Sequence, residues 1–199
     1  MMKPTVLIFA KPPRMGLSKT RLARDIGSTE ARRIARFTLA RTMRATMSPA
    51  WRTELHIAPP RAAGETLGGL WPPGLHRYAQ VSGNLGDRMT HAMMQAPPGP
   101  VIFIGTDTPD IRRSHIDQCT RHLGTDRAVF GPATDGGFWL FGIGHRLRSP
   151  ALFTSVRWSG PHAMEDVWSN LPARTEVTLL PQLIDLDTGE DWNLYKKQP

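Results

Sequence analysis

The stretch Val101–Asp110, VIFIGTDTPD, constrains the fold of this chain more than any other. Its first four residues are apolar and either β-branched or aromatic, which is typical of a strand buried on both faces of a parallel sheet. The strand is expected to stop at Gly105, and two carboxylates, Asp107 and Asp110, follow at once with Pro109 stiffening the turn. Ligands bind at the carboxyl ends of strands in open α/β sheets, so a carboxylate here can hold Mg²⁺ or Mn²⁺ against a phosphate-bearing substrate. An Asp that caps a helix or shapes a turn explains this stretch alone equally well.

Segments that suit strands alternate along the chain with segments that suit helices. This alternation predicts an α/β fold, a three-layer sandwich around a mostly parallel sheet, with residues 1–199 forming one domain. The cluster around residues 128–142 is expected to add an antiparallel pair. The expected strands are Thr5–Ala10, Leu55–Ala58, Leu75–Val81, Val101–Ile104, Ala128–Gly131, Phe138–Gly142, Glu176–Leu180 and a last one, Ile184–Asp187. The expected helices are Thr29–Met47 with Ser28 as its cap, a helix that follows SGNLGDRM and ends near Gln95, Ser114–Leu123, Pro161–Leu171, and a final helix begun by a capping box at Thr188 and Asp191.

The net charge of +8 is concentrated in one segment. Residues 1–50 carry eleven Lys and Arg side chains against two acidic ones, whereas the remainder is nearly neutral. A basic segment can bind nucleic acid or the phosphates of a nucleotide. Five of its arginines fall on the expected helix 29–47, where a solvated helix face is the favoured interpretation: Arg32, Arg33, Arg36, Arg41 and Arg44.

Cysteine usage and the N-terminal residues point to a cytoplasmic protein. The single cysteine, Cys119, excludes an internal disulfide and is expected to fill the core. The apolar run near the N-terminus is too short for a signal peptide or a membrane span. We therefore expect no membrane association.

The first loop, Lys11–Ser18, is the richest in charge. Lys11, Arg14, Lys19 and Arg21 follow the first strand within eleven residues, around a flexible Gly16. Such a loop can surround a polyphosphate with backbone N–H groups and cations. The Lys-Thr pair that follows Ser18 is reminiscent of a P-loop, but Pro13 and Ser18 stand where that motif needs glycine, so we reject it.

Further polar turns follow other strands. Gly83, Asn84, Leu85 and Gly86 open a helix, where free N–H groups can bind a base edge or a phosphate, although most such turns are mere connections. The loop GPATDGG places Asp135 before two glycines.

Asp135 can bind a hydroxyl or act as a base, or it can simply shape a β-turn. Asp185 and Asp187 end the last expected strand, where a second metal ligand would be useful; turn geometry before Thr188 is the alternative for Asp187. Trp158, in RWSG, either lines a pocket or packs in the core. The seven histidines show no metal-ligand spacing.

Six motifs occur in the order expected of one family. They are FAKPPRMGLSKTRLA, QVSGNLGDRM, FIGTDTPDI, GPATDGGFWLFGI, SVRWSG and DLDTGEDW, and they extend from about Val6 to Trp192. With them the chain resembles the DUF2064 family of glycosyltransferase-A-like proteins, some of which are labelled arsenosugar-biosynthesis glycosyltransferases. The pattern is also similar to small nucleotidyltransferases, especially 2-phospho-lactate and molybdenum-cofactor guanylyltransferases. The resemblance implies a nucleotide-diphospho-sugar transferase (GT-A-like) fold.

The resemblance also implies roles for individual residues. The implied nucleotide-binding residues are Ala10, Lys11, Arg14, Gly16, Lys19, Arg21, Gln80, Gly83, Asn84 and Leu85. Asp107 and either Asp187 or Asp185 would hold Mg²⁺ or Mn²⁺, with Asp187 preferred. Lys19, Arg21 and Asp135 would be catalytic, and Asp135, Gly136, Gly137 and Trp158 would contact the acceptor. The chain departs from the family pattern at Ser18, Asn84, Phe138 and Gly189, where valine, aspartate, tyrosine and proline are usual.

Three functions remain open at this point. The leading one is a metal-dependent transferase that moves a sugar from a nucleotide sugar to a small-molecule acceptor. The second is a nucleotidyltransferase that uses a nucleoside triphosphate and releases pyrophosphate. The third is a non-enzymatic nucleic-acid-binding module, suggested by the basic segment, but it explains neither the acidic strand ends nor the DGG loop.

Overall fold

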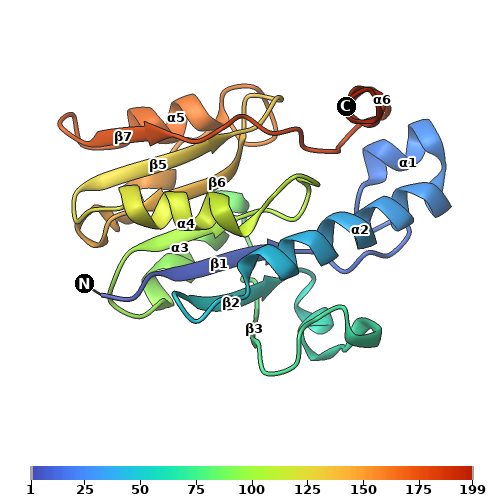
Figure 1. The fold of residues 1–199 in the computed structure, drawn as a ribbon, viewed down its shortest axis with the longest axis horizontal. Coiled ribbons are helices and arrows are strands. Elements are labelled where there is room, and N and C mark those ends of the chain that lie inside the picture. Colours follow the sequence, from blue (N-terminus) through green and yellow to red (C-terminus); the bar gives the residue numbers. More distant parts are fainter. Residues whose placement is uncertain (1, 199) are drawn as a thin grey trace.

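Seven strands form one sheet in the computed structural model, which describes residues 2–198. The order across the sheet is β3-β2-β1-β4-β6-β5-β7 (Figure 1). β6 runs antiparallel to its neighbours β4 and β5, and the other adjacent pairs are parallel. The expected mostly parallel sheet and its antiparallel addition within 128–142 are therefore confirmed. The strands are β1 (Thr5–Ala10), β2 (Arg52–Ile57), β3 (His76–Ala79), β4 (Val101–Ile104), β5 (Arg127–Pro132), β6 (Phe138–Ile143) and β7 (Glu176–Leu179).

β4 is the central strand that its composition predicts. All four of its residues are buried, and it lies between β1 and β6. Alternate side chains of the sheet supply two separate cores, one on each face. Ile102 and Ile104 pack with α2 and α4, whereas Val101 and Phe103 pack with α3 and α5.

The helices complete the three layers. α2 (Ser28–Thr46) and α4 (Arg113–His122) cover one face of the sheet, and α3 (Leu85–Gln95) and α5 (Ala163–Ser169) cover the other (Figure 1). α1 (Thr20–Ile26) and α6 (Gly189–Lys196) pack against each other beyond the end of the sheet. Four short 3-10 helices, η1 (Pro60–Gly64), η2 (Leu67–Gly69), η3 (His145–Leu147) and η4 (Pro150–Phe153), lie in the connections. Cys119 is buried in the core, as expected.

Two features near the N-terminus differ from the sequence-based expectation. The helix α1 was not expected, because its seven residues bury only Leu22 and so show little apolar periodicity. Ser28 is not the cap of α2: Gly27 is its N-cap, and no side chain bonds there. Gly27 has a φ of 85°, and its N–H bonds to the carbonyl of Ala23. The two helices therefore meet at a sharp glycine turn.

The last expected strand, Ile184–Asp187, is wrong. This segment is extended but joins the sheet only through a bridge between Leu183 and Ala133. Its backbone is bonded instead to the loop after β4, where the N–H of Leu186 donates to the carbonyl of Asp107 at 3.1 Å. The capping box of the following helix, between Thr188 and Asp191, is present as expected.

Across residues 2–198, no helix combines the length and the apolarity that a bilayer crossing requires.

Candidate functional site

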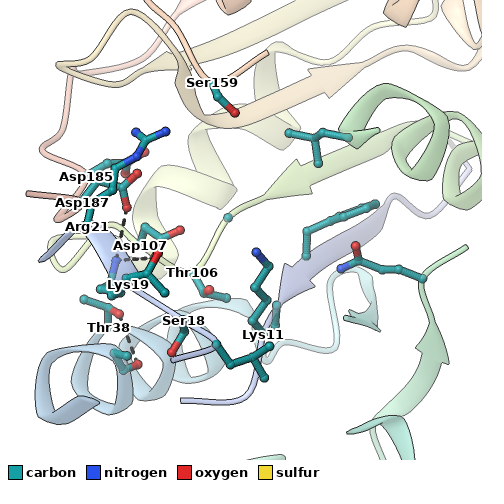
Figure 2. Close-up of a pocket in the computed structure, with 18 of the residues that line it drawn as sticks. Lys11, Ser18, Lys19, Arg21, Thr38, Thr106, Asp107, Ser159, Asp185 and Asp187 are labelled. Atoms are coloured by element: carbon teal, nitrogen blue, oxygen red, sulfur yellow. Dashed lines mark hydrogen bonds and ion pairs between the residues drawn. The ribbon is translucent and has the colours of Figure 1, made fainter. Parts of the chain in front are cut away.

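A cleft of about 570 Å³ opens where the strand order reverses (Figure 2). The chain leaves β1 towards β2 on one side, while β4 lies on the other side of β1. The carboxyl ends of β1 and β4 therefore diverge into a crevice, the usual ligand site of open α/β sheets. The cleft collects many of the residues singled out in the sequence: Ala10, Lys11, Lys19, Arg21, Gln80, Leu85, Asp107, Asp185 and Asp187.

Lys19 occupies the centre of the acidic end of this cleft. It is the N-cap of α1 and has left-handed backbone angles, with φ 50° and ψ 44°. Its side chain is only 2% exposed. The ammonium donates a hydrogen bond to Asp107 Oδ1 and lies 3.8 Å from Asp187 Oδ1 (Figure 2). A non-glycine residue in this conformation is held there by its surroundings, and such strain gathers at functional sites.

Asp185 and Asp187 are held at the cleft by hydrogen bonds to neighbouring residues. The Thr108 hydroxyl donates to Asp185 Oδ1, which ties the 183–188 segment to the turn after β4. The N–H of Asp187 donates to Asp191 Oδ2 at 3.0 Å, so the capping residue of α6 also positions Asp187. Together these contacts bring Asp185 and Asp187 to Asp107 although no shared strand ladder connects them.

The local electrostatics reflect this crowding of acids around one cation. Burial, reinforced by the charge of Asp107, raises the pKa of Asp185 to about 7, although the Thr108 hydrogen bond opposes the shift. Burial and then Asp107 likewise raise the pKa of Asp187. Burial alone would lower the pKa of Lys19, but Asp107, followed by Asp187, outweighs it and the pKa is raised. Lys19 is therefore charged, and the cluster carries excess negative charge when all three acids are ionised.

The opposite end of the cleft is less acidic. Lys11 extends into it from the end of β1 (Figure 2), and Gln80, Leu85 and Arg88 line it. The Gln80 amide is held by the protein, because its Nε2 donates to the carbonyl of His56 at 2.8 Å. Arg88 Nε donates to the Gly83 carbonyl at 3.0 Å. These contacts make a preorganised polar wall.

Several predicted nucleotide-binding residues lie outside the lining. Arg14 pairs with Glu65 at 2.5 Å, and Gly16 is an exposed turn glycine. Asn84 caps α3 in a capping box with Asp87, and its own N–H donates to Asp87 Oδ2 at 2.9 Å. The N–H of Asn84 is therefore not free for a ligand, contrary to expectation. Gly83 has a φ of 110° and packs so closely on Asp87 that a side chain there would collide with it.

The predicted acceptor-binding residues also lie outside the lining. Asp135 is exposed in the β5–β6 turn, where its Oδ1 accepts a hydrogen bond from the Gly137 N–H at 2.9 Å. This hydrogen bond agrees with the interpretation of Asp135 as a turn-shaping residue. The Asp135 charge also contributes to the raised pKa of Asp185 and of Asp187. Gly136 packs against the backbone of Pro161. Trp158 packs on the Phe138 and Phe153 rings, with centroid distances of 6.4 and 6.2 Å.

Other residues face the cleft without having been predicted. Ser159 follows Trp158, has a φ of 63°, and lies across the cleft from Lys11 (Figure 2). Phe138, Thr106, Thr38 and Arg88 also line it. Thr106 lies in the motif FIGTDTPDI and Arg88 in QVSGNLGDRM, so both could have been predicted from those motifs. Thr38 gave none, because it resembles any buried helix residue.

The donor set suits a hard divalent cation. Asp107 and Asp187 are carboxylates with 47% and 43% exposed side chains at the cleft, which is the ligand type that Mg²⁺ and Mn²⁺ prefer. Within residues 2–198, however, no three Asp, Glu, His or Cys side chains converge closely enough to hold an ion. The Lys19 ammonium lies between the two carboxylates instead.

The fold is that of the nucleotide-diphospho-sugar transferases. A candidate nucleotide-diphospho-sugar transferase from Desulfovibrio desulfuricans G20 is 29% identical and superposes with a TM-score of 0.88, over 99% of this chain and 87% of that one. The chain belongs to the DUF2064 family, described as an uncharacterized protein conserved in bacteria, whose model matches residues 39–160. The expected family and fold are therefore confirmed.

More distant structures share the fold alone. A 4-diphosphocytidyl-2C-methyl-D-erythritol synthase from Anaerococcus prevotii is 11% identical with a TM-score of 0.63, over 98% of this chain and 96% of that one. Rv0371C from Mycobacterium tuberculosis H37Rv, solved as a complex with manganese, is 16% identical with a TM-score of 0.57, over 97% of both chains. Comparison with curated proteins gave no match.

Proposed function

We propose that this chain is a one-domain, metal-dependent transferase that moves a sugar from a nucleotide sugar to a small-molecule acceptor. The observation that carries the proposal is the buried Lys19 ammonium between Asp107 and Asp187, in a cleft at the switch point of the sheet. A cation and carboxylates at this place are suited to a diphosphate and its metal ion. The 29% identical Desulfovibrio protein, named as a candidate nucleotide-diphospho-sugar transferase, supports the same class.

Each end of the cleft has a role in this proposal. Asp107 and Asp187 would hold Mg²⁺ or Mn²⁺, and a bound divalent ion would offset negative charge on the departing nucleoside diphosphate. Lys19 and Arg21 would stabilise the same developing charge through fixed positive groups. Lys11, Gln80 and Leu85 line the other end, where the nucleoside would lie.

The acceptor would approach beside Ser159 and Phe138, since these two residues line the cleft while Asp135 and Trp158 do not. Asp135 would act on the carboxylate end of the cleft through its charge, which contributes to the raised pKa of Asp185. Its hydrogen bond to Gly137 keeps that charge in a fixed place.

Nucleotidyl transfer is the second candidate. Four cationic side chains line the cleft, Lys11, Lys19, Arg21 and Arg88, and such groups can contact the phosphates of a triphosphate. An acceptor phosphate would then attack the α-phosphate and pyrophosphate would leave. Nucleic-acid binding is less well supported, because Arg33 pairs with Glu30 and Arg41 donates to the Pro109 carbonyl, as expected of an ordinary helix surface.

Calorimetric titration with a nucleotide panel tests the proposal. The panel contains uridine and guanosine diphosphates, their sugars and the triphosphates, each with and without Mn²⁺, on the wild type and on Asp107→Ala. Metal-dependent binding of one nucleotide sugar that is lost in the variant supports glycosyl transfer. Metal-dependent binding of a triphosphate, and of no nucleotide sugar, supports the second candidate. Binding of no nucleotide under any condition overturns both.

A further inference from the structure

The proposed metal ligands already have a cation. The Lys19 ammonium hydrogen-bonds Asp107 Oδ1 and lies 3.8 Å from Asp187 Oδ1. Its side chain is 2% exposed, so few other partners are within reach. One ammonium thus offsets, from inside the protein, part of the negative charge of the two carboxylates that the proposed function assigns to a divalent ion.

This cation is built into the fold rather than carried on a flexible arm. The Lys19 backbone is left-handed at the start of α1, and α1 is packed on α2 and α6. On the other side, the Asp107 carbonyl accepts a bond from Leu186, and the Thr108 hydroxyl bonds Asp185. The main chain is therefore held on both sides of the contact, and a change in the contact requires one of the two side chains to move.

We propose that Lys19 is an internal counter-ion that competes with the divalent cation for Asp107 and moves to the nucleotide diphosphate when that ligand binds. The consequence is that metal and nucleotide bind cooperatively, with the metal weak in the absence of the nucleotide. This inference rests on the proposed function, because it takes Asp107 and Asp187 as the metal ligands.

Charge repulsion and burial favour this movement of Lys19. An ammonium and a divalent ion repel each other when both approach one carboxylate oxygen, so we expect the ion to displace Lys19 from Asp107 Oδ1. A displaced ammonium in a buried place needs another anion, because an unpaired buried charge is costly. A diphosphate in the same cleft supplies that anion. By linkage, the factor by which the nucleotide strengthens metal binding equals the factor by which the metal strengthens nucleotide binding.

A different arrangement is possible on the same residues. Asp107 has a second oxygen, and its side chain is 47% exposed. An ion on that oxygen would leave the Lys19 contact intact. Lys19 would then weaken metal binding only through long-range charge repulsion, as any nearby cation would.

Mn²⁺ titration followed by electron paramagnetic resonance, without nucleotide, separates the two arrangements. The proteins are the wild type, Lys19→Met, which keeps the side-chain length without the charge, and Arg21→Met. Arg21 is the matched control, since it lines the same cleft and acts on Asp187 by charge, but is exposed. We expect Lys19→Met to bind Mn²⁺ about tenfold or more tighter than the wild type, within the range of coupled sites. We expect Arg21→Met to change the affinity by less than about threefold, because an exposed charge is screened.

The same titrations distinguish a failure of the Lys19 displacement from a failure of the proposed metal site. Equal gains in Lys19→Met and Arg21→Met, or no gain in either while Mn²⁺ still binds, overturn the displacement and leave the proposed metal site standing. Mn²⁺ binding to none of the proteins, even with uridine or guanosine diphosphate, overturns the metal site and this inference together.

If Lys19→Met does not fold, a crystal structure of the wild type soaked in Mn²⁺ tests the same displacement. We expect an anomalous peak at Asp107 with the Lys19 nitrogen no longer bonded to Oδ1. A peak at Asp107 with that bond intact overturns the proposal.

Discussion

Lys19 and Asp107 are 88 residues apart in the chain, yet the buried Lys19 ammonium and the half-exposed Asp107 carboxylate form a hydrogen-bonded ion pair at the point where the strand order reverses. Each residue follows a parallel strand, β1 or β4, and these two strands are neighbours. The pair is therefore a direct product of the sheet topology. It brings the basic first loop to the acidic strand end, which is the arrangement on which the proposed chemistry depends.

Asp107→Asn should lower metal-dependent nucleotide affinity by at least about tenfold, a loss typical of damaged metal sites. The amide keeps the shape of the side chain but removes the charge that would attract the ion. Calorimetric titration with and without Mn²⁺ measures the effect. Asp110→Asn is the control, because Asp110 follows the same strand but does not line the cleft. Equal losses in both variants would contradict the assignment of Asp107.

Replacing Asp185 with Asn should change how stability depends on pH. The pKa of Asp185 is raised from 3.8 to about 7, so the folded protein keeps a proton that the unfolded chain releases. Between about pH 4 and pH 7 the folded state binds more protons, and this group therefore makes the wild type progressively less stable as the pH rises. Relative to Asp185→Asn, the wild type should lose stability up to about pH 7 and then level off. Urea unfolding at several pH values measures this difference; parallel curves would refute the prediction.

Gly131→Ala should destabilise the protein by about 1–3 kcal/mol, the usual cost of overfilling a packed core. A Cβ at Gly131 in β5 would collide with the indole of Trp139 in β6, and that indole is fully buried and donates to the Pro181 carbonyl. Gly64→Ala, where a Cβ meets nothing within 4 Å, should change stability by less than about 0.5 kcal/mol. Thermal and denaturant unfolding test both variants, and similar stability of the two would contradict the packing argument.

The segment 154–160 should loosen when Asp166 is replaced by Asn. Arg157 donates to both carboxylate oxygens of Asp166, from Nη2 at 2.6 Å and from Nε at 2.9 Å, and this clamp holds the segment that carries Ser159. Hydrogen exchange of amides 154–160 should become faster in the variant, while exchange in β4 stays unchanged. Unaltered exchange in the segment would show that other contacts hold it.

The ion pair between Arg157 and Asp166 should persist at mildly acidic pH in the wild type. The hydrogen bond from Arg157 lowers the pKa of Asp166 to about 2, below its value of 3.8 in an unfolded chain. The carboxylate therefore contributes its stabilisation above about pH 4 and loses it as the pH falls towards 2. Between pH 5 and pH 8 Asp166 stays ionised. Hydrogen exchange in residues 154–160, corrected for the intrinsic exchange rate, should therefore not change across this range. A sigmoidal change within that range would contradict the assignment.

The sequence by itself determined the class of fold and the main chemical groups. The apolar run Val101–Ile104 indicated a doubly buried strand, and the order of the six motifs indicated the DUF2064 family and its nucleotide-diphospho-sugar transferase fold. Such patterns are local, because a buried strand and the glycine or proline that ends it are both recognised from residues adjacent in the sequence.

Only the tertiary structure decided which of the predicted side chains share one cleft. Lys19, Asp107 and Asp187 meet because β1 and β4 are adjacent and because Leu186 is bonded to the Asp107 carbonyl, not because of a strand at 184–187. Arg14 and Asp135 were predicted at the site, but Arg14 pairs with Glu65, Asp135 Oδ1 accepts a hydrogen bond from the Gly137 N–H, and neither residue lines the cleft. Side-chain direction depends on partners far along the chain, and the sequence pattern around one residue does not contain them.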